Sequence, residues 1–229
     1  MVEGIFHYRK NRRLAEVEVS GERFDAYVTN SVDLRFLKEG TKCILREAES
    51  LTRSTAFDLY AVYDGNTLVC IDAKEALRVG MDWVINRLVN EEHKEEAKLL
   101  YDDTKSLNFY VTIGGLDQLL MVQVMGTSLV KGKAAYLPEM PSSALNKRLE
   151  SLLLMKDKGK DVRLLFVACR EDAEFFTPNY EADPVFIKLL LLLDNAGVPI
   201  ECLRCRVDAE GMKPEQLIPV KLLNSGTAG

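Results

Sequence analysis

The hydrophobic pattern of this chain changes its period close to Asp72, and that change limits the folds open to it. Before it, short segments such as residues 14–19 alternate apolar and polar side chains, and turn residues separate the segments. After it, apolar residues in 73–89 recur every three or four positions, as on one buried face of a helix. The sequence therefore predicts a small β-barrel or sandwich followed by a mixed α/β part.

The same patterns place the individual elements. Strands are expected at residues 14–19, 24–28, 43–45, 57–62, 68–71, 107–113, 119–124, 162–168 and 200–207, the last of these being the final strand. Helices are expected at residues 73–89, 143–155 and 184–195, with charged residues 90–98 continuing the first. Gly114-Gly115 is typical of a hairpin turn, Ser142 or Ser143 of a helix N-cap, and Gly197 of a helix end.

Composition narrows the class of protein. Hydrophobic residues make up 47% of the 229 residues, enough for real cores, and the formal net charge is −5. An acidic average argues mildly against nucleic-acid binding, although a local basic stripe can act on an acidic protein. The longest apolar run, residues 185–193, is too short for a membrane span and contains Lys188. With no signal-like start, we expect a cytoplasmic protein and no membrane partner.

The five cysteines are an odd, scattered set, which we expect to be free and mostly buried thiols in a reducing cytoplasm. Cys202 and Cys205 have the C-x-x-C spacing, but on a strand they would point to opposite faces. A structural zinc site needs four ligands, and the chain has no second pair of this kind. We therefore expect no metal at these cysteines.

Several short motifs occur in a fixed order along nearly the whole chain. They are Arg9-Lys-Asn-Arg-Arg13, Tyr27-Val-Thr-Asn30, Arg53-Ser-Thr55, Leu165-Phe-Val-Ala-Cys-Arg-Glu-Asp172, Phe176-Thr-Pro178, Asp183-Pro184-Val-Phe186, Ala196-Gly197-Val198 and Ile218-Pro219-Val220. As a series they resemble the sugar fermentation stimulation protein family. The resemblance implies an N-terminal OB-fold in residues 1–75 and a restriction-endonuclease-like mixed α/β domain in residues 76–229. It also implies DNA binding and a link to the regulation of sugar metabolism.

The resemblance further implies a nuclease-type site built from an Asp on one strand and Glu-x-Lys on the next. Its carboxylates would hold Mg²⁺, a hard cation that prefers oxygen ligands. In this sequence the matching positions are Asn108, Gln123 and Met125. Asn and Gln keep hydrogen bonding without the charge, and Met lacks the ammonium. We therefore expect no catalytic residues, no metal and no cofactor.

Two alternatives to this interpretation stay open. The matched segments can be a buried strand pair that never formed a site. Asp102, Asp103 and Asp117 are nearby acids that would have to support a relocated metal site, but none belongs to a Glu-x-Lys motif.

The candidate phosphate-binding residues are the basic ones. Arg9, Lys10, Arg12 and Arg13 are four cations in five residues, and such a cluster attracts a phosphate backbone without reading its sequence. Nearby aromatic residues would add base stacking, the candidates being Tyr8, Phe24 and Tyr27. The other candidates are Arg53, Lys147 and Arg148. The alternative for each of them is a solvated charged surface.

Three hypotheses follow. The leading one is a non-catalytic protein that binds DNA or RNA, with a regulatory role in sugar metabolism. The second is a Mg²⁺-dependent nuclease with a relocated site, against which the neutral residues at positions 108, 123 and 125 speak. The third is a protein-interaction module in which both sites have decayed.

Overall fold

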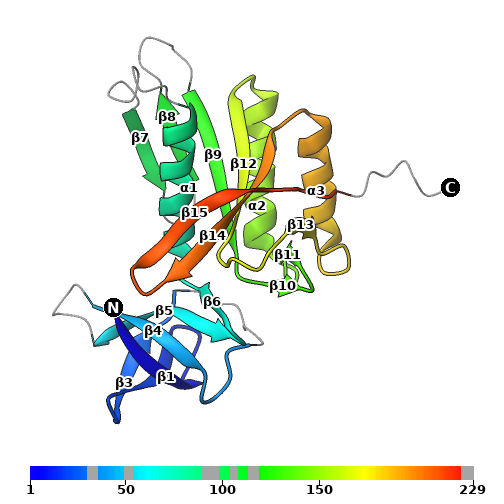
Figure 1. Ribbon diagram of the computed structural model, residues 1–229. Helices are drawn as coiled ribbons and strands as arrows, with labels where there is room; N and C mark the ends of the chain where they lie inside the picture. Colours follow the sequence, from blue (N-terminus) through cyan, green and yellow to red (C-terminus); the bar gives the residue numbers. More distant parts are fainter. Residues whose placement is uncertain (30–35, 49–53, 89–97, 104–107, 113–118, 223–229) are drawn as a thin grey trace.

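The computed structural model describes residues 1–29, 36–48, 54–88, 98–103, 108–112 and 119–222. Within them the chain forms two parts, a β-barrel and an α/β domain, with the barrel drawn below the α/β domain in Figure 1. Among the described residues, no helix is long and apolar enough to cross a membrane.

The barrel has five strands that close on themselves and a sixth that leads out of it. They are β1 (Val2–Arg9), β2 (Leu14–Val19), β3 (Glu22–Tyr27), β4 (Lys42–Glu47), β5 (Phe57–Asp64) and β6 (Thr67–Cys70). β1 pairs with β2 and β4, β2 with β3, and β4 with β5, all antiparallel. A parallel pairing of β3 with β5 closes the barrel. This is the strand order of an OB-fold, so the N-terminal fold expected from the sequence is confirmed.

Alternation along the strands fills the barrel, as the sequence pattern predicts. Ala15 and Val17 of β2 are fully buried and pack in one cluster with Leu45 and Leu59 from the opposite strands. The turn between β2 and β3 has two residues with positive φ, Ser20 at 52° and Gly21 at 85°. Such turns match the twist of the strands that they join.

The α/β domain is built on a six-stranded sheet in the order β15-β14-β12-β9-β8-β7. Its strands are β7 (Lys98–Asp103), β8 (Asn108–Thr112), β9 (Leu119–Thr127), β12 (Asp161–Ala168), β14 (Ile200–Asp208) and β15 (Gly211–Ile218). A small sheet contains β10 (Val130–Lys131), β11 (Ala134–Leu137) and β13 (Phe175–Pro178). The helices are α1 (Ala73–Leu88), α2 (Ser143–Asp157) and α3 (Pro184–Asn195). β9, β12 and β14 are parallel, and β7, β8 and β15 run antiparallel to their neighbours.

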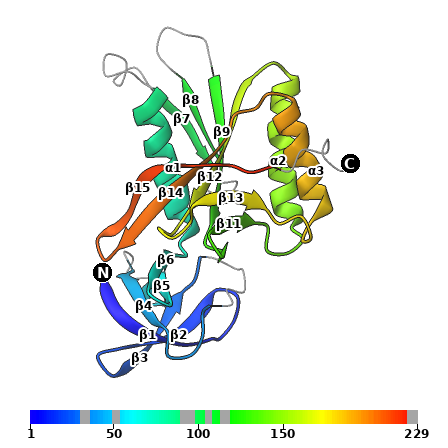
Figure 2. The same cartoon turned by 45° about the vertical axis from the view of Figure 1, so that its right-hand side comes forward.

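Helices cover both faces of this sheet, as Figure 2 shows. α1 packs on the face that carries Val122 and Val124, whereas α2 and α3 pack on the face that carries Met121 and Met125. α1 lies close to β9 because Gly126 has no side chain. A Cβ there would come within 2.7 Å of the Cβ of Ala76.

The helices predicted at 73–89, 143–155 and 184–195 correspond to α1, α2 and α3, and Ser142 is the N-cap of α2. The prediction that residues 200–207 form the final strand is wrong, because β15 follows. β15 lies at the sheet edge and buries only Met212 and Ile218 fully, so its apolar pattern is weak. Residues 89–97 and the Gly114-Gly115 turn lie outside the described residues.

Hydrogen bonds that involve main-chain groups join the end of β6 to the α/β domain. The backbone N–H of Cys70 donates to the carbonyl of Cys169 over 3.0 Å, and the hydroxyl of Ser128 donates to the carbonyl of Cys70 over 2.9 Å. Apolar clusters also cross the junction, one of which contains Leu129 together with the barrel core. Tyr60 and Leu68 of the barrel belong to another, which they share with α1 and the sheet.

Arg170, at the end of β12, is buried at the same junction. Its guanidinium donates to both carboxylate oxygens of Asp172, over 2.6 and 2.7 Å. It also donates to Asp64 of the barrel over 2.9 Å and to the carbonyl of Ser128 over 3.0 Å. The side chain is only 4% exposed. Arg170 therefore forms a buried structural ion pair between the two parts.

All five cysteines are free and buried, as expected. Burial raises the pKa of the Cys43 and Cys202 thiols to about 12. Cys202 packs in the cluster on the α2 and α3 face, and Cys205 in the cluster on the α1 face. The two thiols therefore lie on opposite sides of the sheet, as the strand geometry predicts.

Asp183 joins α2 to α3 at their N-terminal ends. One carboxylate oxygen accepts hydrogen bonds from the N–H groups of Val185 and Phe186 and so caps α3. The other accepts from the N–H of Ser142, over 2.9 Å, and from the side-chain amide of Asn146, over 3.1 Å. Burial by itself would raise the pKa of Asp183, but these hydrogen bonds outweigh it and hold the pKa below its ordinary value.

We predict that Asp183→Ala lowers the free energy of unfolding by about 2–4 kcal/mol, because it removes a cap and leaves buried N–H groups without acceptors. Asp183→Asn keeps one acceptor and costs less. Since the folded pKa lies below that of the unfolded chain, near 4, ionised Asp183 stabilises the fold above that pH. The advantage of the wild type over Asp183→Asn should shrink as pH falls from 5 to 3. Urea unfolding measures this, and a pH-independent difference would contradict it.

Candidate nucleic-acid interface

The three nuclease-type positions come together in the sheet. Asn108 on β8 is paired directly with Gln123 on β9, which on its other side is paired with Leu164 of β12. Met125 lies two residues further along β9, on the same face as Gln123. Gln123 is 0% exposed and Met125 is 1% exposed. The pairing of the two strands agrees with the 15-residue spacing, but Gln123 and Met125 are buried in the domain core.

The residues present do not fit a Mg²⁺ or Ca²⁺ site. Met125 packs with Leu149 and Phe166 in an apolar cluster, and the side-chain amide of Gln123 donates to the carbonyl of Val124 over 3.1 Å. A thioether and a neutral amide are poor ligands for hard cations. Across the described residues, no three His, Cys, Asp or Glu side chains are grouped so as to hold a metal.

The acids considered for a relocated site are distributed as follows. Asp103 on β7 is paired with Asn108, and Asp102 with Phe109. Asp117 lies outside the described residues. Among the described residues, the backbone register thus places one acidic position, Asp103, beside Asn108, whereas the nuclease-type site implied by the resemblance uses two carboxylates.

A cleft of about 960 Å³ lies where the barrel meets α1. On the barrel side its lining includes the β1–β2 connection, with Asn11 and Arg13, and the β4–β5 connection, with Thr55. On the other side it includes Lys74 and Arg78 of α1. In an OB-fold these two connections border the usual ligand-binding face. The cleft is therefore the part of the surface where these barrel loops face a helix of the second domain.

Two of the three acids that line this cleft, Asp72 and Glu75, are buried and paired with arginine, whereas Asp58 of β5 is half-buried. Arg46 of β4 donates to Asp72 over 3.3 Å and to Glu75 over 2.9 Å, and Arg78 also donates to Glu75. Burial raises the pKa of Asp72 above its ordinary value, although Arg46 and the N–H of Lys74 act in the opposite direction. These contacts hold α1 against the barrel.

The cations of the cleft are more exposed than its acids. Arg13 and Lys74 are exposed, and half of the Arg78 side chain is accessible. Arg13 donates to the carbonyl of Thr29 over 2.7 Å, and its guanidinium lies 6.0 Å from the centre of the Tyr27 ring. Tyr27 also lines the cleft. The cleft thus presents exposed positive charge beside an aromatic ring, with one half-buried acid, Asp58, also in its lining.

Of the basic cluster near the N-terminus, only Arg13 lines this cleft. Lys10 is paired with Asp25 over 2.6 Å and with Glu16 over 3.4 Å, and the hydrogen bond to Asp25 raises its pKa. Arg12 is exposed in the turn after β1, and Arg9 is half-buried at the end of that strand. Much of the charge of Lys10 is therefore already compensated within the barrel.

The remaining candidates lie elsewhere. Arg53 falls outside the described residues. Lys147 is exposed and Arg148 half-buried on α2, which packs on the sheet face opposite α1. The structure therefore does not bring these two together with Arg13.

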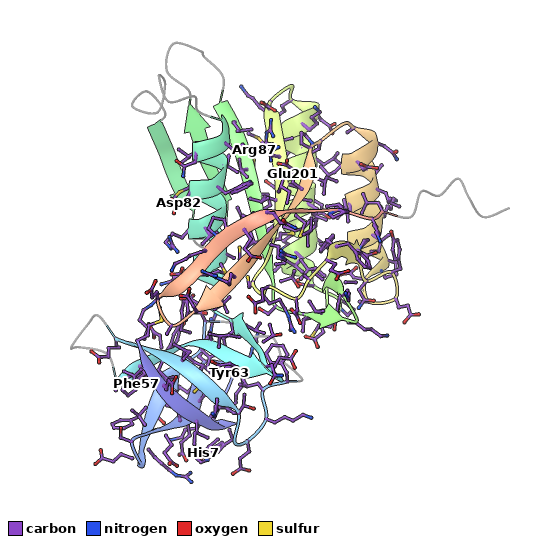
Figure 3. The ribbon with its side chains drawn as sticks, in the orientation of Figure 1. His7, Phe57, Tyr63, Asp82, Arg87 and Glu201 are labelled. Carbon is purple, nitrogen blue, oxygen red and sulfur yellow. The ribbon has the colours of Figure 1, made fainter. Side chains whose placement is uncertain are left out.

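The three candidate aromatic residues lie in different surroundings. Tyr8 donates to Glu16 over 3.2 Å, and Phe24 packs edge-on against Phe57 with ring centres 5.3 Å apart. Tyr27 alone of the three lines the cleft. Figure 3 shows Phe57 on the barrel and His7 on the barrel side away from the α/β domain.

Sequence reasoning missed the contribution of α1 to this cleft. Lys74 and Arg78 are four residues apart, so a helix predicted from residue 73 places them on one face. That spacing was the available signal. Nothing in the local pattern showed that this face meets the barrel.

Family comparisons match both parts of the chain. The SfsA N-terminal OB domain matches residues 8–71, and the sugar fermentation stimulation protein RE domain matches residues 73–211. The chain belongs to the sugar fermentation stimulation protein family. The resemblance drawn from its motifs is thereby confirmed.

Relatives in this family match the chain over nearly its whole length. The homologue from Alkaliphilus metalliredigens is 30% identical over 209 residues, which is 90% of each chain. The homologue from Methanobrevibacter smithii is 29% identical over 235 residues and covers 96% of each. The structure of Pyrococcus furiosus SfsA in complex with Ca²⁺ is 19% identical, with a TM-score of 0.82 over 96% of this chain and 95% of that one. This last likeness shows the shared fold.

We predict that Gln123→Glu destabilises the protein by about 3 kcal/mol at pH 7, because it buries a carboxylate among apolar side chains. Burial raises the pKa of the new carboxyl above that of the unfolded chain, near 4.3, so the penalty grows as pH rises from 5 to 8. Gln216→Glu, on the exposed part of β15, is the matched control and should change little. If the two variants are equally stable at pH 7, the prediction is wrong, because position 123 then accommodates a carboxylate.

Proposed function

We propose that this chain is a nucleic-acid-binding protein that does not cut its ligand. The observation that carries the proposal is the meeting of the β1–β2 and β4–β5 connections at one cleft, with Arg13 and Lys74 exposed at it. In other OB-folds the same two connections and the adjoining strands hold oligonucleotides. DNA and RNA both satisfy this chemistry.

The charge arrangement supports binding in spite of the acidic average. Asp72 and Glu75 are buried and bonded to arginines, so their charge is largely compensated. Arg13 and Lys74 stay accessible to a phosphate group. A nucleic-acid backbone that binds these cations releases its condensed counterions. The affinity of the protein for it therefore falls steeply as the salt concentration rises. Tyr27 offers a ring for base stacking at the same place.

The absence of cutting is supported by the donor chemistry of β9. Phosphodiester cleavage assisted by a metal needs charged oxygen ligands near the reacting phosphate. Gln123 and Met125 are neutral and buried beneath α2 and α3 rather than lining the cleft. A regulatory role in sugar metabolism rests only on the name that the relatives carry, "Sugar fermentation stimulation protein homolog".

The proposal predicts salt-dependent binding that needs Arg13. Fluorescence anisotropy with labelled 20-mers of DNA and RNA should give binding at low salt, weakened several-fold by Arg13→Ala. The slope of log affinity against log salt should fall by roughly one in that variant. Lys188→Ala, an exposed lysine of α3, is the control and should bind as the wild type does.

Two results would contradict the proposal. One is a wild-type protein that binds neither nucleic acid at low ionic strength. The other is cleavage of the oligonucleotide that requires Mg²⁺, Mn²⁺ or Ca²⁺ and stops with chelator, which would favour the nuclease hypothesis.

A further inference from the structure

We infer that α1 forms the second half of the binding site, and that the ligand is a single strand held between the barrel and the α/β domain. The inference rests on the proposed function and names its ligand class and two further contacts, Lys74 and Arg78. The cleft is lined from both sides, by Arg13 and Tyr27 of the barrel and by these two residues of α1.

Lys74 and Arg78 are one helical turn apart, so both face the barrel loops along the same side of α1. The two residues differ in how far neighbouring acids neutralise their charge. Arg78 donates to Glu75 over 2.9 Å and to Asp82 over 3.2 Å. Within the described part of the chain, Lys74 has no ion pair. Lys74 is therefore the α1 cation with more charge to offer a phosphate.

The two walls are held at a fixed separation before any ligand binds. The hydroxyl of Thr29 accepts from the N–H of Ala73 over 3.2 Å and donates to the carbonyl of Ile71 over 3.3 Å. Arg46 links the barrel to Asp72 and Glu75 of the α1 start. A site that is formed in advance loses less freedom on binding.

The size of the cleft favours a single strand. Its volume of about 960 Å³ is that of a small-ligand pocket and suits a few unpaired nucleotides. Tyr27 can stack only with a base that is not already stacked within a duplex. A duplex would instead remain at the rim and contact fewer of these groups.

The test compares a labelled 15-mer of oligo(dT) with a hairpin duplex of equal length, by anisotropy over a salt series. The wild type should bind the single strand at least about ten-fold more tightly, and Lys74→Ala should weaken that binding about three- to ten-fold. The salt slope for the single strand should fall by about 0.7, the value for one lost phosphate contact. Lys188→Ala is the matched control for removing an exposed helical lysine, and thermal unfolding checks that both variants are folded.

The outcomes separate this inference from the proposed function. If Arg13→Ala weakens binding but Lys74→Ala behaves like Lys188→Ala, the role of α1 is overturned and the barrel site stands. Equal or tighter binding of the duplex overturns the single-strand assignment. If the wild type binds neither ligand, the proposed function fails, and this inference fails with it.

Discussion

The buried guanidinium of Arg170 fixes how the barrel and the α/β domain sit together. It is satisfied only when Asp64 of the barrel, Asp172 and the carbonyl of Ser128 surround it. Breaking a buried pair leaves a charge without a partner, at a cost of several kcal/mol, so one arrangement of the two parts is strongly favoured. Arg46 makes the reverse link, from the barrel to Asp72 and Glu75. These links fix the position of α1 relative to the barrel, and they thereby fix the width of the cleft between them.

The neutral side chains on β9 and the packing of the α/β domain have one physical cause. Gln123 and Met125 occupy a face that α2 and α3 cover, where an unpaired carboxylate or ammonium would cost several kcal/mol. Neutral side chains at these positions let the sheet close over them. A phosphate would have to reach the core of the domain to meet them, whereas Arg13 and Lys74 are exposed and line the cleft between the barrel and α1.

The fold was largely predictable because its signals are local. The period of apolar residues, the Ser142 cap and the Asp183-Pro184 start fix the three helices. β15 escaped prediction because an edge strand buries few side chains and so carries little pattern. The candidate site was predictable only in part. Arg13 belongs to a basic run and Tyr27 to a family motif, so both could be predicted. Lys10 is in the same basic run, but it forms ion pairs with Asp25 and Glu16.

The sequence by itself determined the three helices, most of the strands and the neutral residues at positions 108, 123 and 125, since each depends on residues close together in the chain. Only the tertiary structure decided which charges are accessible. Lys74 and Arg78 face Arg13 because long-range ion pairs at Arg46 and Arg170 bring α1 to the barrel loops. Those pairs join residues from 26 to 106 positions apart, and periodicity along the chain carries no information about such contacts.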